Sequence, residues 1–256
     1  MVKTNSVKAW LLATRPKTLS AAAVPVMIGT AFAWRNTSEQ FNWIPAILCL
    51  LFAWIMQIDS NLVNDYFDFK KGNDDETRLG PKRACSEGWI TSDAMVWGIL
   101  ITTLLGCMTG IPLILYGGLE MVMVGIACVV FCFLYTTLFS YHGLGDILVL
   151  LFFGIIPVCC TYYVCMPLHQ QIPTGEVIAS SIACGLAIDA LLIVNNYRDI
   201  DNDRSNSKIT LAVRLGESKT RRLYESIGYI SAGIMIILVF FDLYQIDKLI
   251  PTYALY

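Results

Sequence analysis

Two short acidic motifs stand at the ends of long apolar stretches in this sequence. The first reads Asn64-Asp65-Tyr66-Phe67-Asp68, and the second reads Asn195-Asn196-Tyr197-Arg198-Asp199. In each, an Asn and an Asp are four residues apart, a spacing that places both oxygen-bearing side chains on one face of a helix. Carboxylates near hydrocarbon are costly unless they pair, face a cavity or bind a cation. The motifs therefore predict ligands for a hard cation.

Each motif opens a polar loop in which acidic and basic residues alternate. Carboxylate and amide oxygens suit magnesium, which commonly bridges protein oxygens to phosphate, whereas Lys and Arg bind phosphate oxygens directly. Two acidic sets beside two basic sets predict a diphosphate held through magnesium ions. One such loop alone would be read as an ordinary solvated surface of mixed charge. Its repetition at two apolar boundaries favours the functional interpretation.

The composition is typical of a polytopic membrane protein. Hydrophobic residues make up 56% of the 256 residues, charged residues only 15%, and the mean hydropathy is +0.60. Windows of about 20 residues, the length that crosses a bilayer as a helix, predict an all-α bundle that forms one domain over residues 1–256. Membrane lipid is thus an expected partner, and nucleic acid is not. The seven candidate spans are residues 10–34, 43–64, 94–116, 119–140, 144–166, 177–197 and 224–241.

The basic residues predict the orientation of these spans. Of the 18 Lys and Arg residues, all but Arg35 and Lys248 fall on one side of a seven-span arrangement. Such residues concentrate in cytoplasmic loops, so both acidic motifs are expected on the cytoplasmic face of the cell inner membrane. The first span follows a charged start and lacks a small-residue cleavage site, which makes a cleavable signal peptide the weaker interpretation.

The repeated motif indicates two related halves with a functional site where they meet. Secondary transporters share this organisation and bind cations through membrane carboxylates, so an ion-coupled transporter is an alternative. Transporter sites lie near the middle of the bilayer, however. Here the motifs stand at span ends beside phosphate-binding cations, which favours an enzyme.

Small residues and cysteines inside the spans have ordinary interpretations. Gly145, Gly154 and Pro157 could kink the fifth span or simply allow close packing, and the sequence leaves both open. The nine cysteines lack paired metal-site spacing, and most stand inside apolar stretches as small hydrophobes. Cys85, in the basic loop, is the one expected to be exposed.

At the two motifs the sequence resembles the UbiA-type intramembrane aromatic prenyltransferases. That family carries an N-D-x-x-D motif in its second helix and a D-x-x-x-D motif in its sixth, which here are residues 64–68 and 199–203. Narrower matches resemble the branch that prenylates 1,4-dihydroxy-2-naphthoate in menaquinone synthesis. They are Arg15-Pro16-Lys17-Thr18-Leu19, Lys71-Gly72-x-Asp74, Arg78-x-Gly80-Pro81-x-Arg83, His142-Gly143-Leu144-Gly145-Asp146, and Lys208-x-Thr210-Leu211-Ala212-Val213-Arg214-Leu215-Gly216.

The resemblance implies a role for each matching residue. Asn64 and Asp68 would bind one magnesium, Asp199 and Asp203 the other, and Asp74 resembles an outlying third acid. Diphosphate ligands would be Arg78, Lys82, Arg83, Lys208 and Arg214. Arg15, Tyr135, Ser140 and Tyr141 resemble cavity residues, and Asp68, Asp199 and Tyr141 are the candidates for catalysis. The family has nine transmembrane helices, so the last ones are expected to be absent from these 256 residues.

The implied reaction joins a polyprenyl diphosphate to an aromatic acid. Magnesium and basic side chains would neutralise the departing diphosphate, and an electron-rich ring carbon would capture the allylic cation with loss of carbon dioxide. A dry cavity with aromatic walls, including Tyr135 and Tyr141, would protect the cation from water. Within the same family, 4-hydroxybenzoate, homogentisate or another acceptor stays an alternative to the naphthoate.

Overall fold

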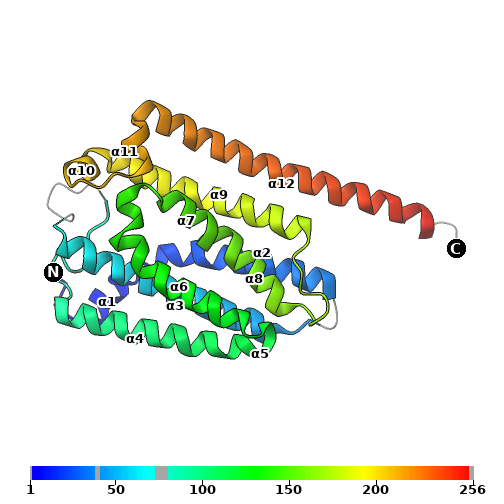
Figure 1. Ribbon diagram of the computed structural model, residues 1–256, viewed down its shortest axis with the longest axis horizontal. Coiled ribbons are helices and arrows are strands. Elements are labelled where there is room, and N and C mark those ends of the chain that lie inside the picture. The colour runs from blue at the N-terminus through cyan, green and yellow to red at the C-terminus, as the bar shows by residue number, and fades with distance from the viewer. Residues whose placement is uncertain (1, 38–40, 73–79, 254–256) are drawn as a thin grey trace.

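The computed structural model describes residues 2–37, 41–72 and 80–253, and every regular element in these ranges is a helix (Figure 1). The predicted residues Asp74 and Arg78 lie outside the described residues. The first half contains α1 (Val7–Ala13), η1 (Pro16–Thr18), α2 (Leu19–Thr37), α3 (Trp43–Lys70), α4 (Ser92–Gly110), η3 (Ile111–Leu113), α5 (Ile114–Gly117) and α6 (Glu120–Thr137). The second half contains η4 (Phe139–His142), α7 (Gly145–Leu150), η5 (Leu151–Ile155), α8 (Ile156–Cys165), α9 (Gly175–Arg198), α10 (Ile200–Ser205), α11 (Leu211–Leu215) and α12 (Glu217–Tyr253).

Several helices begin at side-chain caps that the sequence supplies. Asn42 accepts a hydrogen bond from the Ile44 amide at the start of α3, and Thr91, Thr174 and Thr210 cap α4, α9 and α11 in the same way. An Asn or Thr oxygen at this position satisfies an amide that has no partner within the helix. Local chemistry thus fixes where the polar loops end and the helices begin.

Six helical segments within the described ranges are long and apolar enough to cross a membrane, which confirms an all-α membrane bundle. They are Trp43–Lys70, Ser92–Gly117, Glu120–Thr137, Gly145–Cys165, Gly175–Arg198 and Glu217–Asp242. The remaining predicted span, residues 10–34, is not among these six segments. Arg15 has a left-handed backbone (φ 49°) and Pro16 follows it, so the chain breaks after α1 and resumes as α2 at Leu19.

Successive long helices run in alternating directions, which gathers particular loops at one end of the bundle (Figure 1). The N-terminal segment, residues 80–91 before α4, η4, and the α10–α11 region all lie at this end. Helices α3 and α9 both terminate there, so the two acidic motifs share one end of the molecule, as the sequence predicts. At the opposite end Arg35 forms ion pairs with Glu176 and Asp242 and joins α2, α9 and α12.

The second half packs closely through glycine. The predicted fifth span contains a π-helical turn, η5, and its Gly154 faces Gly185 of α9. A Cβ built at Gly154 would lie 2.6 Å from the Gly185 Cα and 2.6 Å from the Ser181 carbonyl oxygen. Both interpretations left open by the sequence therefore apply: the span is locally distorted, and its glycine permits backbone contact.

Candidate active site

A cavity of about 730 Å³ extends into the bundle from the end that carries the acidic motifs. Its volume is within the range of small-molecule sites. Residues of both motifs and of the adjoining loops line its polar end, whereas aliphatic, aromatic and cysteine side chains line most of its body. The polar end comprises Asn64, Asp68, Arg83, Asn195, Asn196, Asp199, Asn202, Asp203 and Lys208. The structure thus brings together two motifs that are far apart in the sequence.

The first motif places Asn64 and Asp68 around one guanidinium group. Arg83 Nη2 lies 3.0 Å from Asp68 Oδ2, and the two residues are only 6% and 3% exposed. Arg83 Nη1 donates to Asn64 Oδ1, and Asn64 Nδ2 donates to Thr136 Oγ1 at 3.4 Å. An Asp and an Arg are costly to bury apart, so their pairing stabilises each in this position. The guanidinium that is predicted to bind phosphate is thereby held beside the predicted metal ligands.

Asp65, between these ligands, faces the other way. Its carboxylate accepts hydrogen bonds from the amides of Ala84 (2.8 Å) and Cys85 (2.9 Å), and the residue is 1% exposed. These bonds fix the turn that immediately follows Arg83. The prediction that Cys85 is exposed is wrong, because this turn packs into an apolar cluster with Leu62 and Cys85 is 5% exposed.

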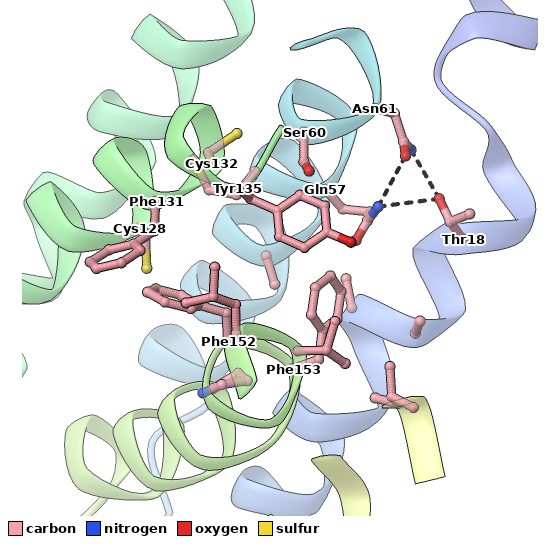
Figure 2. Close-up of a pocket in the computed structure, with 18 of the residues that line it drawn as sticks. Thr18, Gln57, Ser60, Asn61, Cys128, Phe131, Cys132, Tyr135, Phe152 and Phe153 are labelled. Carbon is pink, nitrogen blue, oxygen red and sulfur yellow. Dashed lines mark hydrogen bonds between the residues drawn. The ribbon is translucent and has the colours of Figure 1, made fainter. Parts of the chain in front are cut away.

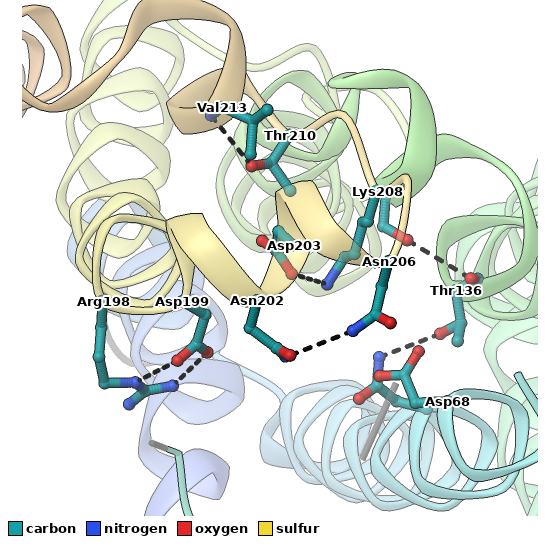
Figure 3. Close-up of polar contacts among 12 residues, drawn as sticks. Asp68, Thr136, Arg198, Asp199, Asn202, Asp203, Asn206, Lys208, Thr210 and Val213 are labelled. Carbon is teal, nitrogen blue, oxygen red and sulfur yellow. Dashed lines mark hydrogen bonds and ion pairs between the residues drawn. The ribbon is translucent and has the colours of Figure 1, made fainter. Parts of the chain in front are cut away.

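The second motif presents carboxylates from the end of α9 and from α10 (Figure 3). Arg198 holds both oxygens of Asp199, at 2.8 and 2.7 Å. Asp203, one helical turn further, lies 3.3 Å from Lys208 Nζ through Oδ1. Its Oδ2 is buried and has no hydrogen-bond partner within the described ranges. Asp201 instead points to solvent, with a side chain 87% exposed.

The charges of the two motifs act on one another. Burial raises the pKa of Asp203, and the carboxylates of Asp199 and Asp68 raise it further, against the opposing effect of Lys208. Burial likewise lowers the pKa of Lys71, with Asp68 opposing this shift and Lys208 adding to it. Because Asp68 acts on both groups, the two motifs are within electrostatic reach. The raised pKa of Asp203 means that burial and the neighbouring carboxylates disfavour its charged form.

The other predicted site residues divide into two groups. Arg15, Tyr135 and Ser140 line the cavity with the two motifs. Lys82 pairs with Glu87 at 2.8 Å, with a side chain 68% exposed, and Arg214 donates to the His142 carbonyl at 2.7 Å. Neither lines the cavity, and nor does Tyr141, whose ring lies 3.6 Å from Lys71 Nζ. Lys82 and Arg214 as diphosphate ligands and Tyr141 as a catalytic residue stay predictions that these contacts do not support.

The donor atoms at the polar end fit magnesium bound together with a phosphate ligand. Across the residues with described positions, no three His, Cys, Asp or Glu side chains converge on one point. Instead, Asn64 and Asp68 form one oxygen set, and Asp199, Asn202 and Asp203 another. Magnesium is usually held by one or two carboxylates plus water and substrate phosphate, so incomplete oxygen sets of this kind are suitable. The unpartnered Asp203 Oδ2 is an available ligand atom.

Sequence reasoning missed several polar residues of the cavity. Asn202 stands between Asp199 and Asp203, lines the cavity and accepts a hydrogen bond from Asn206 Nδ2 at 3.1 Å. Asp146 lines the cavity with both carboxylate oxygens buried and without hydrogen-bond partners among the described side chains. Gln57 lies deeper, within α3. For Asp146 and Gln57 the available signal was a polar residue within an apolar span, which is expensive and therefore usually functional.

Comparison with known proteins identifies the family. The model of the UbiA prenyltransferase family matches residues 22–256. The chain is 38% identical over 251 residues to 1,4-dihydroxy-2-naphthoate octaprenyltransferase of Escherichia coli (strain K12), an alignment that covers 94% of this chain and 79% of the relative. It is 34% identical to the protein of the same name from Mycobacterium tuberculosis (strain ATCC 25618 / H37Rv), with 90% and 77% covered.

A solved structure shares the fold. The UbiA homolog from Archaeoglobus fulgidus bound to DMAPP and Mg2+ superposes with a TM-score of 0.65 over 96% of this chain and 84% of that one, at 16% sequence identity. This likeness supports the helical architecture, while the sequence matches establish the relationship. The chain belongs to the UbiA prenyltransferase family.

Proposed function

We propose that the protein transfers a polyprenyl chain from a polyprenyl diphosphate to 1,4-dihydroxy-2-naphthoate, with decarboxylation, in a magnesium-dependent reaction. One observation carries this proposal: a cavity with paired acidic motifs, a buried arginine and a partly buried lysine at its polar end continues into an apolar body. The polar end suits a diphosphate and the apolar body suits an isoprenoid chain. The names of the bacterial relatives support the choice of acceptor.

The polar end would promote departure of the diphosphate. Asn64 and Asp68 would hold one magnesium, and Asp199 and Asp203 the other; bound there, the ions would neutralise the charge that develops on the diphosphate. Arg83 and Lys208, which already lie beside these acids, would contact the phosphate oxygens. Charges fixed in advance where negative charge develops lower the barrier most effectively.

The apolar body would protect the allylic cation. Breaking the carbon–oxygen bond leaves the electron pair on the diphosphate, and water would convert the remaining cation to an alcohol. Phe131 and Phe152 pack with ring centroids 5.1 Å apart in the cavity wall, and Phe153 also lines it. These rings exclude water and offer their faces to a cation. Tyr135 contributes to the same lining.

The acceptor ring would supply the electrons for the new bond. A π pair of the dihydroxynaphthoate attacks the allylic carbon, forming a carbon–carbon bond. The bond to the ring carboxylate then breaks, its electron pair returns to the ring, and carbon dioxide leaves. The site would open to the cytoplasmic side of the inner membrane, in accordance with the distribution of basic residues, while the tail stays in contact with lipid.

Turnover by the purified protein tests this proposal. The protein in lipid vesicles would be mixed with magnesium, labelled polyprenyl diphosphate and a panel of aromatic acids. We expect prenylated product, diphosphate and carbon dioxide in equal amounts with 1,4-dihydroxy-2-naphthoate, and loss of turnover with a chelator. A preference for 4-hydroxybenzoate or homogentisate would identify that acid as the acceptor in place of the naphthoate. Ion-dependent uptake of solute without diphosphate release would instead support a transporter.

A further inference from the structure

A buried amide oxygen in the cavity wall has no hydrogen-bond donor. Gln57 is 9% exposed and lines the cavity, and its Oε1 is buried without a partner in the described parts of the chain. We propose that Gln57 Oε1 accepts a hydrogen bond from a ring hydroxyl of the aromatic acceptor and so orients the ring. This inference rests on the proposed function and adds a specificity-determining residue to it.

The orientation of this amide is dictated by its neighbours, beginning with the backbone (Figure 2). The Thr14 carbonyl can only accept, so Asn61 must present its nitrogen to it, and Nδ2 lies 3.0 Å away. Asn61 Oδ1 then faces Gln57, which must also present its nitrogen, at 3.2 Å. The oxygen of Gln57 is consequently directed away from Asn61.

Thr18 closes the same network. Its hydroxyl donates to the Arg15 carbonyl at 2.9 Å, so its oxygen is left to accept. It accepts from Asn61 Nδ2 at 2.9 Å and from Gln57 Nε2 at 3.4 Å. Rotating the Gln57 amide by half a turn would place its oxygen against Thr18 Oγ1 and Asn61 Oδ1. Neither of these oxygens has a proton to donate to it. The unpaired lone pairs of the buried Oε1 are thus a fixed property of the cavity wall.

The position of Gln57 suits the ring of an acceptor. It precedes Asn64 by seven residues on α3, which places both on one helix face about 10 Å apart along the axis. Asn64 and Asp68 lie at the diphosphate end, and Phe152 and Phe153 line the deeper wall around Gln57 (Figure 2). A flat aromatic molecule bound between the diphosphate and these rings would meet Oε1 at its edge.

The chemistry of Oε1 distinguishes the groups of the acceptor. A buried acceptor atom without a donor is costly, and a phenolic or naphtholic hydroxyl relieves that cost. A carboxylate, which carries no proton to donate, would be repelled by the same oxygen. Gln57 would therefore draw the hydroxyl-bearing edge of the ring toward itself and turn the carboxylate elsewhere. Donating this hydrogen bond would also raise the electron density in the ring, which favours attack on the cation.

Competitive inhibition by three naphthoates tests this role. The probes are 1-hydroxy-2-naphthoate, 4-hydroxy-2-naphthoate and 2-naphthoate, measured against turnover of 1,4-dihydroxy-2-naphthoate by the wild type and by Gln57→Met. In the wild type one hydroxylated probe should bind roughly tenfold more tightly than 2-naphthoate, the effect of one hydrogen bond to a buried group. In Gln57→Met that preference should disappear, with the KM for polyprenyl diphosphate unchanged.

The other outcomes overturn the inference in distinct ways. Equal binding of all three probes by the wild type would mean that Oε1 is satisfied by water. A hydroxyl preference that survives in Gln57→Met would assign the hydrogen bond to another residue; Gln57→Leu gives the same comparison if the Met variant does not fold. An absence of turnover with every aromatic acid would instead overturn the proposed function itself.

Discussion

Asp65 and Asp68 stand three residues apart, yet their carboxylates have separate surroundings. Asp68 faces the cavity and Arg83, whereas Asp65 binds two backbone amides of the turn after Arg83. The first position suits a ligand and the second suits a structural support. One short motif thus supplies both a candidate metal ligand and the anchor that positions a buried cation beside it.

Removing the charge of a cavity-facing acid should strongly reduce turnover. Asp68→Asn and Asp203→Asn should each lower kcat by about 10²- to 10³-fold, because each removes a fixed charge at the diphosphate end. Initial rates at saturating magnesium measure this effect. Asp201→Asn is the matched control: it removes a carboxylate from the same helix as Asp203, but its side chain is 87% exposed and should leave kcat within twofold. Equal losses in all three variants would refute the assignment.

Asp65→Asn should reduce stability as well as activity. An Asn has one acceptor oxygen, so one of the two amides of Ala84 and Cys85 would lose its bond. A buried amide left unpaired costs about 1–3 kcal/mol, and a misplaced Arg83 should raise the KM for polyprenyl diphosphate. Thermal unfolding in detergent and initial rates measure both effects. An unchanged unfolding midpoint would show that Asp65 does not support the turn.

At this scale the sequence predicts which residues belong to the site better than it predicts the contacts that those residues make. Asn64, Asp68 and Asp199 could be chosen because acidic motifs at span ends require compensation, whereas Asp203 was implied by the family resemblance; all four line one cavity. The separate orientation of Asp65 depends on a turn twenty residues away, which no local spacing reveals. Lys82 and Arg214 were predicted from their charge and from the resemblance, and neither shows whether a side chain pairs with Glu87 or a carbonyl instead.

At the scale of elements, the contact between η5 and α9 determines how the second half closes around the cavity. Gly154 and Gly185 bring two backbones together, and Phe152 and Phe153 of the same π-helical turn line the cavity. The sequence indicates a small residue here but not the helix it meets, because partner choice depends on the tertiary arrangement. The break after α1 is similar: Pro16 is visible, whereas the left-handed backbone of Arg15 is not.

Gly154→Ala should destabilise the bundle, although alanine usually favours a helix. The added methyl group would lie 2.6 Å from Gly185 Cα and should cost about 1–3 kcal/mol through overpacking. Gly228→Ala in α12 is the matched control, because a Cβ there meets nothing within 4 Å, and it should be neutral or stabilising by about 0.5–1 kcal/mol. Thermal unfolding of the two variants measures the difference. Similar midpoints would contradict the proposed contact.

At the scale of the whole molecule, alternating helices place both motifs at one end, the arrangement that the basic residues predict. Periodicity and hydropathy were sufficient for this conclusion, because long apolar helices must cross the bilayer and each crossing reverses direction. The volume and lining of the cavity depend on packing between helices that are distant in sequence, and these could not be predicted.

Cysteine labelling tests the orientation. Asp201→Cys, at the motif end, should react with a membrane-impermeant maleimide in inside-out vesicles, and Ile172→Cys, in the connection before α9, should react in intact spheroplasts. Both positions are well exposed, with Ile172 at 84%. The unsubstituted protein provides the background, since Cys107 is also exposed. Labelling of both positions from the same side would contradict the topology.

The central claim is that the two acidic motifs hold one diphosphate through divalent cations. Binding of manganese, measured by electron paramagnetic resonance in the presence of an unreactive polyprenyl diphosphate analogue, tests it most directly. We expect diphosphate-dependent binding at each motif in the wild type, with Asp68→Asn and Asp203→Asn each losing one of the bound ions and Asp201→Asn losing none. Manganese binding that is undiminished in both cavity-facing variants would contradict the account.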